Sequence, residues 1–317
     1  MKIVVMEPLG VALEKINALA VALQAAGHEF VYYTSKETQQ DKLLERVQDA
    51  DIIMLANQPL SAEIINACPK LKMLSVAFTG VDHIALDACR ARNILVCNAA
   101  GYSTNAVAEL TFGLAISVIR NIVLCDARCR RAGTKDGLVG FELFGKTFGV
   151  VGTGAIGARV AKIAAAFGCR VLAYSRTAKQ ELVDAGVQYV SLDELLAQSD
   201  FVSLHVPLTD ATRGLINAAA IAKMKQGAVL LNTARGPVVD SAALAEALNA
   251  GKLAGAGIDV FEGEPPIAEN HPLCSAKNTV LTPHVAFASR EALETRADIV
   301  FANIEKWLNG APQNVVR

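Results

Sequence analysis

Residues 150–157 read VVGTGAIG, an apolar run that turns into a glycine-rich loop. Gly152, Gly154 and Gly157 fit the pattern G-x-G-x-x-G, with a predicted strand (KTFGVV) before it and a predicted helix (AIGARVAKIAAAFG) after it. In such a loop the first glycine permits a tight turn, the second lets the backbone approach a pyrophosphate, and the third lets helix and strand pack closely. The amides at the start of the helix then face the phosphates. The stretch therefore predicts a dinucleotide-binding fold that begins well inside the chain.

The next predicted strand, within CRVLAYSR (169–176), ends where a NAD site usually carries an Asp or Glu for the ribose hydroxyls. This chain has Ser175, Arg176 and Thr177 there and no acid. An arginine with two hydroxyls suits a 2′-phosphate better than a free diol. The pattern favours NADP(H). Two alternatives stay open: Arg176 is a solvated surface residue, or it stacks on adenine and accepts either cofactor.

The residues before the glycine loop have an alternating pattern of their own. Short apolar runs (KIVVM, FVYYT, DIIMLA, KMLSVAF and ILVCNA) predict strands, and the segments between them have helical spacing. Ser61 is a predicted helix N-cap and Gly27 a predicted C-cap. A length of 317 residues allows two domains. The first 100 residues or so are therefore predicted to form a small α/β domain with parallel strands.

The segment from Thr104 to Arg131 is different, because it is largely apolar over several turns and contains no proline. The sequence predicts one long helix there that bridges two domains and buries a face against a second subunit. The alternative is a single helix buried between the domains. We favour the first interpretation, which predicts a homodimer.

The composition excludes several classes of protein. The chain is 52% hydrophobic and 19% charged with a formal net charge of −1, which indicates a globular protein without an electrostatic basis for binding nucleic acid or an acidic membrane. No stretch approaches the roughly 20 apolar residues of a membrane span, and the N-terminal apolar run is too short for a signal peptide. The seven cysteines lack zinc-site spacing. They predict free thiols, no metal and a cytoplasmic location.

Three polar residues with acid–base or charge chemistry each follow a predicted strand. Arg235 ends AVLLNTAR, Glu264 lies in DVFEGEPP, and His284 lies in VLTPHVA. Ligands of open parallel sheets bind outside the carboxyl ends of the strands, so the three are predicted to meet in one crevice. Taken singly, each is also explained as a capping or solvated residue.

The chain resembles the D-isomer-specific 2-hydroxyacid dehydrogenases over its whole length. The motifs that carry the resemblance are VAFTGVDHI, GTGAIG, HVPLT, NTARGPVVD, DVFEGEPP, TPHVA and NIEKWLNG, in that order. The resemblance implies an α/β architecture in which a Rossmann dinucleotide-binding domain, residues 100–286, is inserted into a smaller flavodoxin-like substrate domain, residues 1–99 and 287–317. It also implies an NAD(P)-dependent oxidoreductase that interconverts a small 2-keto acid and a D-2-hydroxy acid.

The resemblance also assigns roles to residues. Arg235 would hold the substrate carboxylate and polarise the ketone, and His284 would exchange the proton on the carbonyl oxygen. Glu264 would accept the other imidazole N–H and fix the tautomer. Amides around Phe78, Thr79 and Gly80 would bind the carboxylate, and Asp259 would meet the nicotinamide carboxamide. The full cofactor-binding set is predicted as Gly152, Gly154, Ala155, Ile156, Gly157, Ser175, Arg176, Thr177, Val206, Pro207, Thr212, Thr233, Ala234, Arg235, Asp259, His284 and Ala286.

Some positions depart from the family pattern and bear on the substrate. Many relatives have a basic residue where Ala155 stands, so phosphate contact there rests on amides. An aromatic residue at the position of Phe287 resembles the pattern of the hydroxypyruvate and glyoxylate reductases and glycerate dehydrogenases. Hydroxypyruvate or glyoxylate is therefore the expected substrate. The alternative is 3-phosphoglycerate oxidation. An enzyme for that reaction would be expected to have more cationic side chains near Phe78, and many such enzymes have a regulatory domain after the position of Arg317. A nucleotide-sensing corepressor-like binding protein is the alternative from another class, and it would carry added flexible tails.

Overall fold

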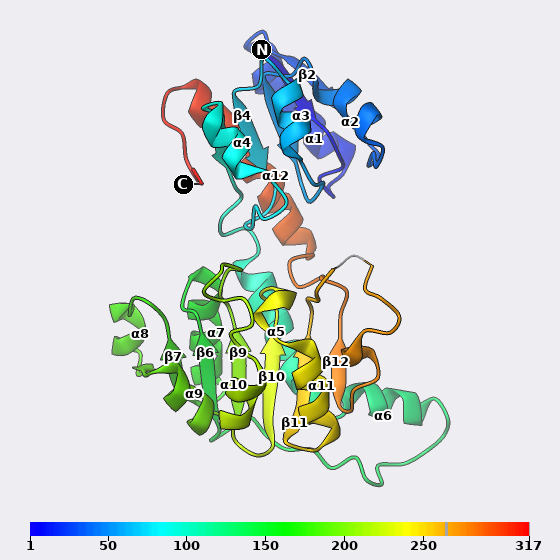
Figure 1. The fold of residues 1–317 in the computed structure, drawn as a ribbon, viewed down its shortest axis with the longest axis vertical. Helices are drawn as coiled ribbons and strands as arrows, with labels where there is room; N and C mark the ends of the chain where they lie inside the picture. Colours follow the sequence, from blue (N-terminus) through cyan, green and yellow to red (C-terminus); the bar gives the residue numbers. More distant parts are fainter. Residues whose placement is uncertain (264–265, 317) are drawn as a thin grey trace. The chain divides into compact units, whose positions relative to one another are not determined.

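The computed structural model describes residues 1–263 and 266–316 and shows two compact units (Figure 1). Unit 1 contains Met1–Ser103 and Ala288–Arg317, and unit 2 contains Thr104–Phe287. The chain therefore leaves unit 1 after Ser103, builds the whole of unit 2, and returns to unit 1 after Phe287. In sequence terms unit 2 is an insertion into unit 1.

Unit 1 is a five-stranded parallel sheet in the order β2-β1-β3-β4-β5, which is the flavodoxin-like order. This confirms the fold expected for the first 100 residues. The strands are β1 (Lys2–Val5), β2 (Glu29–Tyr32), β3 (Ile52–Leu55), β4 (Met73–Val76) and β5 (Leu95–Cys97). The helices are α1 (Leu13–Ala25), α2 (Gln40–Val47), α3 (Ala62–Ala67), α4 (Leu86–Ala91) and α12 (Arg290–Leu308).

The structure confirms the predicted helix caps of unit 1. The hydroxyl of Ser61 accepts a hydrogen bond from the Ile64 amide at 3.4 Å and caps α3. Gly27 follows α1 with a φ of +81°, a left-handed conformation that suits glycine. Every residue of β3 and β4 is buried, as is typical of central strands in a parallel sheet covered on both faces.

The last segment of the chain completes unit 1. On α12 the carbonyl of Val300 accepts a hydrogen bond from the buried Ser75 hydroxyl at 2.9 Å. Asn303, also buried, donates through Nδ2 to the Asn98 carbonyl at 2.9 Å. The five-stranded sheet is therefore fastened to a helix encoded almost 200 residues after its last strand, counting from Cys97 to Arg290.

Unit 2 is a seven-stranded parallel sheet in the order β12-β11-β10-β9-β6-β7-β8, the doubly wound Rossmann order. This confirms the predicted dinucleotide-binding fold. The strands are β6 (Thr147–Val151), β7 (Arg170–Tyr174), β8 (Gln188–Tyr189), β9 (Phe201–Leu204), β10 (Ala228–Asn232), β11 (Leu253–Ile258) and β12 (Thr279–Leu281). The helices are α5 (Thr104–Ile119), α6 (Ile122–Cys129), α7 (Ala155–Ala166), α8 (Gln180–Asp184), α9 (Leu192–Gln198), α10 (Ala218–Lys223) and α11 (Ser241–Asn249).

Two apolar layers enclose this sheet. Alternate strand residues point to opposite faces, so Val150 belongs to one buried cluster and Val151 to the other. The first cluster is packed by residues of α5 and α7, including Phe112 and Ala161, and the second by residues of α9, α10 and α11. Burial on both faces makes the sheet a rigid platform, with the loops at its carboxyl edge free to hold functional groups.

The prediction of one long helix from Thr104 to Arg131 is wrong. The structure has two helices, α5 and α6, with a bend of 61° between them. Asn121 has a φ of +53°, a left-handed conformation that asparagine tolerates better than most residues and that ends a helix. Helix α5 has seven buried residues, whereas α6 has none, because only α5 packs into the core of unit 2.

The bend between α5 and α6 also decides whether this region meets the criteria for a membrane-spanning helix. No single helix in residues 1–263 and 266–316 combines the length and the hydropathy that a membrane span requires. Helices α5 and α6 meet those criteria only when they are taken together across their bend, by length and composition alone.

Candidate active site

The predicted site residues of unit 2 follow five strands that are neighbours in the sheet, β12-β11-β10-β9-β6. The glycine loop follows β6, and residues 205–207 follow β9. Residues 233–235 follow β10, Asp259 follows β11, and residues 282–286 follow β12. Because all strands are parallel, these segments lie along one edge. The connections diverge between β6 and β9, the switch point where ligands of such sheets bind.

The glycine loop has a steric reason for Gly152 and Gly157 and leaves open space at Gly154. Gly152 has a φ of +93°, and an added Cβ would lie 2.6 Å from the His205 carbonyl oxygen. At Gly157 a Cβ would lie only 1.9 Å from the Gly152 oxygen, so any side chain there would push helix α7 off the loop. At Gly154, the residue before α7, a Cβ would meet no atom within 4 Å. The loop thus leaves open space over the helix start, with Ala155 and Ile156 as its first residues, and it fits a pyrophosphate.

The end of β7 carries the residues expected near the adenosine ribose. Ser175 is half-buried, and Arg176 and Thr177 are exposed. The glycine loop is tied to this strand, because the Gly152 amide donates to the Tyr174 carbonyl at 2.7 Å. Residues 175–179 contain no carboxylate. A cation and a hydroxyl therefore stand where a diol-binding acid would be expected.

Tyr189 supports this region and was missed by the sequence analysis. Its hydroxyl donates to the buried Thr153 hydroxyl of the glycine loop at 3.1 Å and accepts from the Lys179 amide at 3.0 Å. It thereby joins the glycine loop to the segment after β7. It lies on β8, a strand of only two residues, which is too short for a periodic pattern to reveal.

The loop after β9 lies against the glycine loop. An added Cβ at Gly152 would lie 2.8 Å from a methyl group of Val206. Thr212 fixes the rest of this loop, because its hydroxyl donates to the Pro207 carbonyl at 2.6 Å and accepts from the Thr209 amide at 2.8 Å. Thr212 therefore ties together Pro207 and Thr209, which follow Val206 at this side of the predicted cofactor site.

The sequence predicted no role of its own for His205, yet its ring forms a hydrogen bond to the strand before this loop. Its Nε2 is 2.8 Å from the Ser203 hydroxyl, and burial lowers the pKa of His205 to about 3. The imidazole is therefore uncharged at neutral pH, and it contributes shape and a neutral hydrogen bond rather than a mobile proton.

The turn after β10 presents Arg235. The buried Asn232 organises it, accepting from the Ala234 amide and donating to the Arg235 carbonyl, both at 3.0 Å. The Arg235 guanidinium donates through Nη1 to the Ala234 carbonyl at 2.8 Å. An added Cβ at Gly236 would lie 2.1 Å from the Phe261 carbonyl carbon, so this glycine brings the turn against the backbone after β11. Glu264, the predicted partner of His284, lies outside the described residues.

Thr233 is fixed from α5. Its hydroxyl is 3.0 Å from the hydroxyl of Thr111, which itself donates to the Val107 carbonyl at 2.8 Å. Thr233 is therefore the donor of the pair. Thr111 is fully buried and was not predicted, because its partner Thr233 lies 122 residues further along the chain.

Asp259 positions the segment that carries His284. Its Oδ1 accepts from the Thr282 hydroxyl at 2.5 Å and from the Val285 amide at 2.9 Å, and its Oδ2 accepts from the Ala286 amide at 2.9 Å. The carboxyl is buried, and desolvation raises the pKa of Asp259 above its ordinary value although these bonds oppose the shift. The family resemblance assigned Asp259 only to the nicotinamide; in the structure its carboxylate orients residues 282–286.

His284 itself has an uncommon backbone conformation. Its φ is +53°, and its amide donates to the Asp259 carbonyl at 2.7 Å and to the Thr282 carbonyl at 3.0 Å. The ring contacts Phe287 edge to face, with 5.7 Å between the centroids. A non-glycine residue held in the left-handed region by its surroundings is a frequent feature of functional sites.

In unit 1, the turn of Phe78, Thr79 and Gly80 follows β4. The Phe78 carbonyl accepts from the Ala99 amide at 2.9 Å, and the Thr79 carbonyl accepts from Asn98 Nδ2 at 2.8 Å. Within the part of the chain that the structure describes, the amides of Thr79 and Gly80 donate to no protein group. The turn is therefore anchored through its acceptors, which leaves these two donors for a ligand.

A Rossmann sheet with this glycine loop, and with arginine and histidine after strands of the same edge, is typical of a nicotinamide dinucleotide-dependent oxidoreductase. The family described as "D-isomer specific 2-hydroxyacid dehydrogenase, NAD binding domain" matches residues 112–286. The chain belongs to the D-isomer-specific 2-hydroxyacid dehydrogenase family.

Relatives and solved structures agree with this assignment. The chain is 35% identical to a hydroxypyruvate reductase from Blautia hydrogenotrophica, over 100% of this chain and 99% of that protein. It is 41% identical to a glyoxylate reductase from Thermococcus litoralis, over 86% of each. Among solved structures it is similar to the acyclic imino acid reductase Bsp5 in complex with NADPH and D-Arg, with a TM-score of 0.90, 31% identity and full coverage of both chains. It is also similar to a D-lactate dehydrogenase from Aquifex aeolicus complexed with NAD and lactic acid, with a TM-score of 0.84, 32% identity and coverage of 98% and 96%.

Proposed function

We propose that this protein reduces hydroxypyruvate or glyoxylate to the corresponding 2-hydroxy acid with a nicotinamide cofactor. The observation that carries the proposal is the placement of Arg235 and His284 at the ends of β10 and β12, on either side of Asp259 after β11. This arrangement supports Arg235 as the carboxylate-binding cation and His284 as the proton donor, on the edge that holds the glycine loop. The names of the two reductases above support the choice of substrate.

Each residue has a defined task in this proposal. The reduced cofactor, when bound, supplies a hydride to the carbonyl carbon. Arg235 binds the carboxylate and polarises the ketone, and His284 gives its proton to the carbonyl oxygen, which becomes the hydroxyl. In the reverse direction His284 takes that proton back. We assign the stabilisation of the imidazolium to Glu264 on the family motif alone, and carboxylate binding in unit 1 to the amides of Thr79 and Gly80.

The test is a panel of 2-keto acids assayed by the loss of NAD(P)H absorbance. Hydroxypyruvate and glyoxylate should have a higher kcat/KM than pyruvate or 3-phosphohydroxypyruvate. A clear preference for the phosphorylated acid would move the assignment to 3-phosphoglycerate oxidation. Tight NAD(P)H binding with no turnover of any acid would favour a binding protein instead. The matched blank is the His284→Asn variant, which keeps the fold but has no group for proton transfer.

We also propose that the enzyme prefers NADPH to NADH, because Arg176 offers positive charge and Ser175 a hydroxyl where a diol site has an acid. Ser175→Asp should reverse the order of kcat/KM. The new carboxylate repels a 2′-phosphate and accepts hydrogen bonds from the hydroxyls of a free ribose diol. The preference should be modest: an exposed ion pair contributes about 1 kcal/mol or less, and a tenfold ratio needs about 1.4 kcal/mol. The measurement is kcat/KM for both cofactors at one salt concentration.

The control for this cofactor experiment is Ser175→Asn, which has the same shape as the aspartate variant without its charge. It should leave the NADPH preference close to that of the unmodified enzyme. A clear preference for NADH in the unmodified enzyme would remove Arg176 from phosphate recognition. A reversal in the asparagine variant would show that shape, and not charge, discriminates.

We further propose a homodimer, with α6 and the segment after it in the interface. Helix α5 is buried in unit 2, so the exposed apolar surface of this region belongs to α6 and to residues further on: Val123 is 57% exposed, Val139 90% and Phe144 74%. Sedimentation equilibrium at micromolar concentration should give twice the 33.4 kDa mass of one chain. Val123→Asp should give monomers, whereas Val21→Asp, at a position 60% exposed in unit 1, should not. A monomer mass for the unmodified protein would end this proposal.

A further inference from the structure

Unit 1 contains a buried arginine that no motif of the sequence predicted. Arg296 lies on α12 and is only 4% exposed. Its guanidinium carbon is 5.2 Å from the centre of the Phe78 ring and 5.8 Å from that of Tyr102, and its Nη2 donates to the Leu9 carbonyl. Burial lowers the pKa of Arg296 below its ordinary value. A charge is retained at such a position only where aromatic faces and hydrogen bonds replace its hydration.

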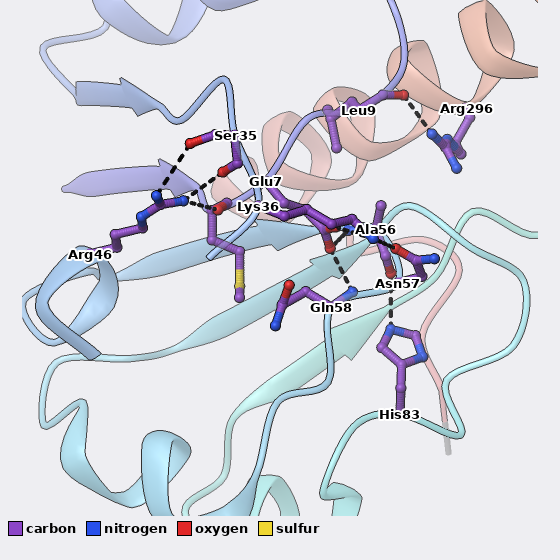
Figure 2. A network of polar contacts seen from close by, with 11 residues as sticks. Glu7, Leu9, Ser35, Lys36, Arg46, Ala56, Asn57, Gln58, His83 and Arg296 are labelled. Carbon is purple, nitrogen blue, oxygen red and sulfur yellow. Dashed lines mark hydrogen bonds and ion pairs between the residues drawn. The ribbon is translucent and has the colours of Figure 1, made fainter. Parts of the chain in front are cut away.

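A fully buried carboxylate, Glu7, lies after β1 in the same unit. Its Oε1 accepts from the amides of Ala56 and Gln58, each at 2.7 Å, and Lys36 Nζ is 3.5 Å from its Oε2 (Figure 2). The negative charge of Glu7 also acts on Arg296, where it favours the protonated guanidinium. The two charges therefore belong to one buried electrostatic arrangement.

The contacts of these two residues form a closed circuit around Phe78. Glu7 holds the Ala56 amide, and the Ala56 carbonyl is 2.9 Å from His83 Nε2, as Figure 2 shows. The His83 ring meets Phe78 edge to face, with 6.5 Å between the centroids. Arg296 lies over the Phe78 ring and donates to the Leu9 carbonyl, two residues after Glu7, which closes the circuit. We call Glu7, His83, Arg296 and Phe78 the Phe78 clamp.

We propose that Arg296 is a positioning residue for substrate binding, which acts through the Phe78 clamp to fix the amides of Thr79 and Gly80. The clamp holds the side chain of the first residue of the turn, and Ala99 and Asn98 hold its carbonyls. Such a turn is already ordered before a carboxylate binds, so the conformational entropy lost on binding is small. The inference rests on the proposed function, in which these amides bind the carboxylate of the 2-keto acid.

The central test is Arg296→Met, which keeps the length and apolar stem of the side chain and removes its charge and donors. We expect the KM for the keto acid to rise about tenfold, with kcat changed less than about threefold and the Kd for NAD(P)H unchanged. Arg296→Lys should recover part of the loss because it restores the charge. Phe78→Leu should give a similar rise in KM, and the double variant should be no worse than the single ones, because both changes break one circuit.

The control is Val300→Ala, a fully buried position on the same helix whose side chain serves only core packing. It should lower Tm without raising KM. If Arg296 only fastened α12, its variant would behave in the same way, with a lower Tm and an unchanged KM, and the inference would be overturned. If Arg296→Met does not fold, His83→Gln decides, because it keeps a donor for the Ala56 carbonyl but loses the ring contact to Phe78. A raised KM in that variant supports the clamp, and an unchanged KM overturns it.

The unmodified enzyme separates this inference from the proposed function. Turnover of a 2-keto acid with a measurable KM supports the function whatever the Arg296 variant does. An unmodified enzyme that turns over no 2-keto acid overturns the proposed function and the clamp's role together. An active enzyme with equal KM values in all clamp variants overturns only the clamp.

Discussion

His284→Ala should lower kcat for keto-acid reduction by about 100-fold or more while the Kd for NAD(P)H stays close to that of the unmodified enzyme. A positioned acid–base group contributes about 10²- to 10⁴-fold, and the carbonyl oxygen needs a proton as hydride arrives. The measurement is steady-state kcat together with cofactor binding followed by fluorescence. Turnover close to that of the unmodified enzyme would remove His284 from the mechanism.

The backbone of His284 supplies a sharper variant for the same experiment. Its φ of +53° is a conformation that asparagine adopts more readily than alanine does. His284→Asn therefore preserves the loop and a hydrogen-bonding side chain but has no proton to transfer at neutral pH. An equal loss of kcat in the alanine and asparagine variants assigns the effect to proton transfer. A much smaller loss in the asparagine variant assigns it to loop conformation.

Arg235→Lys should raise the KM for the keto acid and lower kcat, each by about tenfold or more. Lysine lacks the planar fork that binds a carboxylate through two parallel hydrogen bonds. The structure adds a second reason: one Arg235 nitrogen donates to the Ala234 carbonyl at 2.8 Å, and lysine has a single nitrogen in place of the fork whose other nitrogens stay available for a carboxylate. The control is Arg213→Lys, at an exposed position of the same unit, which should change neither constant. An unchanged KM in Arg235→Lys would show that Arg235 does not bind the carboxylate.

Much of the fold was predictable because its signals are local. Buried parallel strands are short apolar runs, and the glycine loop places its steric requirements within six residues: the structure shows a Cβ clash at Gly152 and at Gly157, and open space at Gly154. The family resemblance implied both kinds of fold, and the structure has the strand order of each. The bend at Asn121 was missed because apolar content reports burial and not the direction of the backbone. One left-handed residue redirects the helix without altering the apolar pattern around it.

The positions of Arg235 and His284 were predictable because each lies three residues after the end of a strand. The supporting residues were not, since their partners are distant in sequence: Thr111 pairs with Thr233, and Arg296 covers Phe78. Arg296 lies 218 positions after Phe78, so the residues next to the turn give no sign of a cation there. The roles of the site residues stay predictions, and Glu264 lies outside the described part of the chain.

The insertion of unit 2 into unit 1 has a consequence for synthesis on the ribosome. All five strands of the first sheet are translated by Cys97, but the helix that covers part of it, with Val300, Phe301 and Ile304 buried, is translated last. The nascent chain therefore carries an incomplete first sheet through the translation of all of unit 2, which can close its own core first. During that interval the uncovered apolar face is a target for chaperones or for aggregation. Premature termination before α12 should thus be more damaging to the first unit than to the second, although the lost residues lie at the opposite end of the chain.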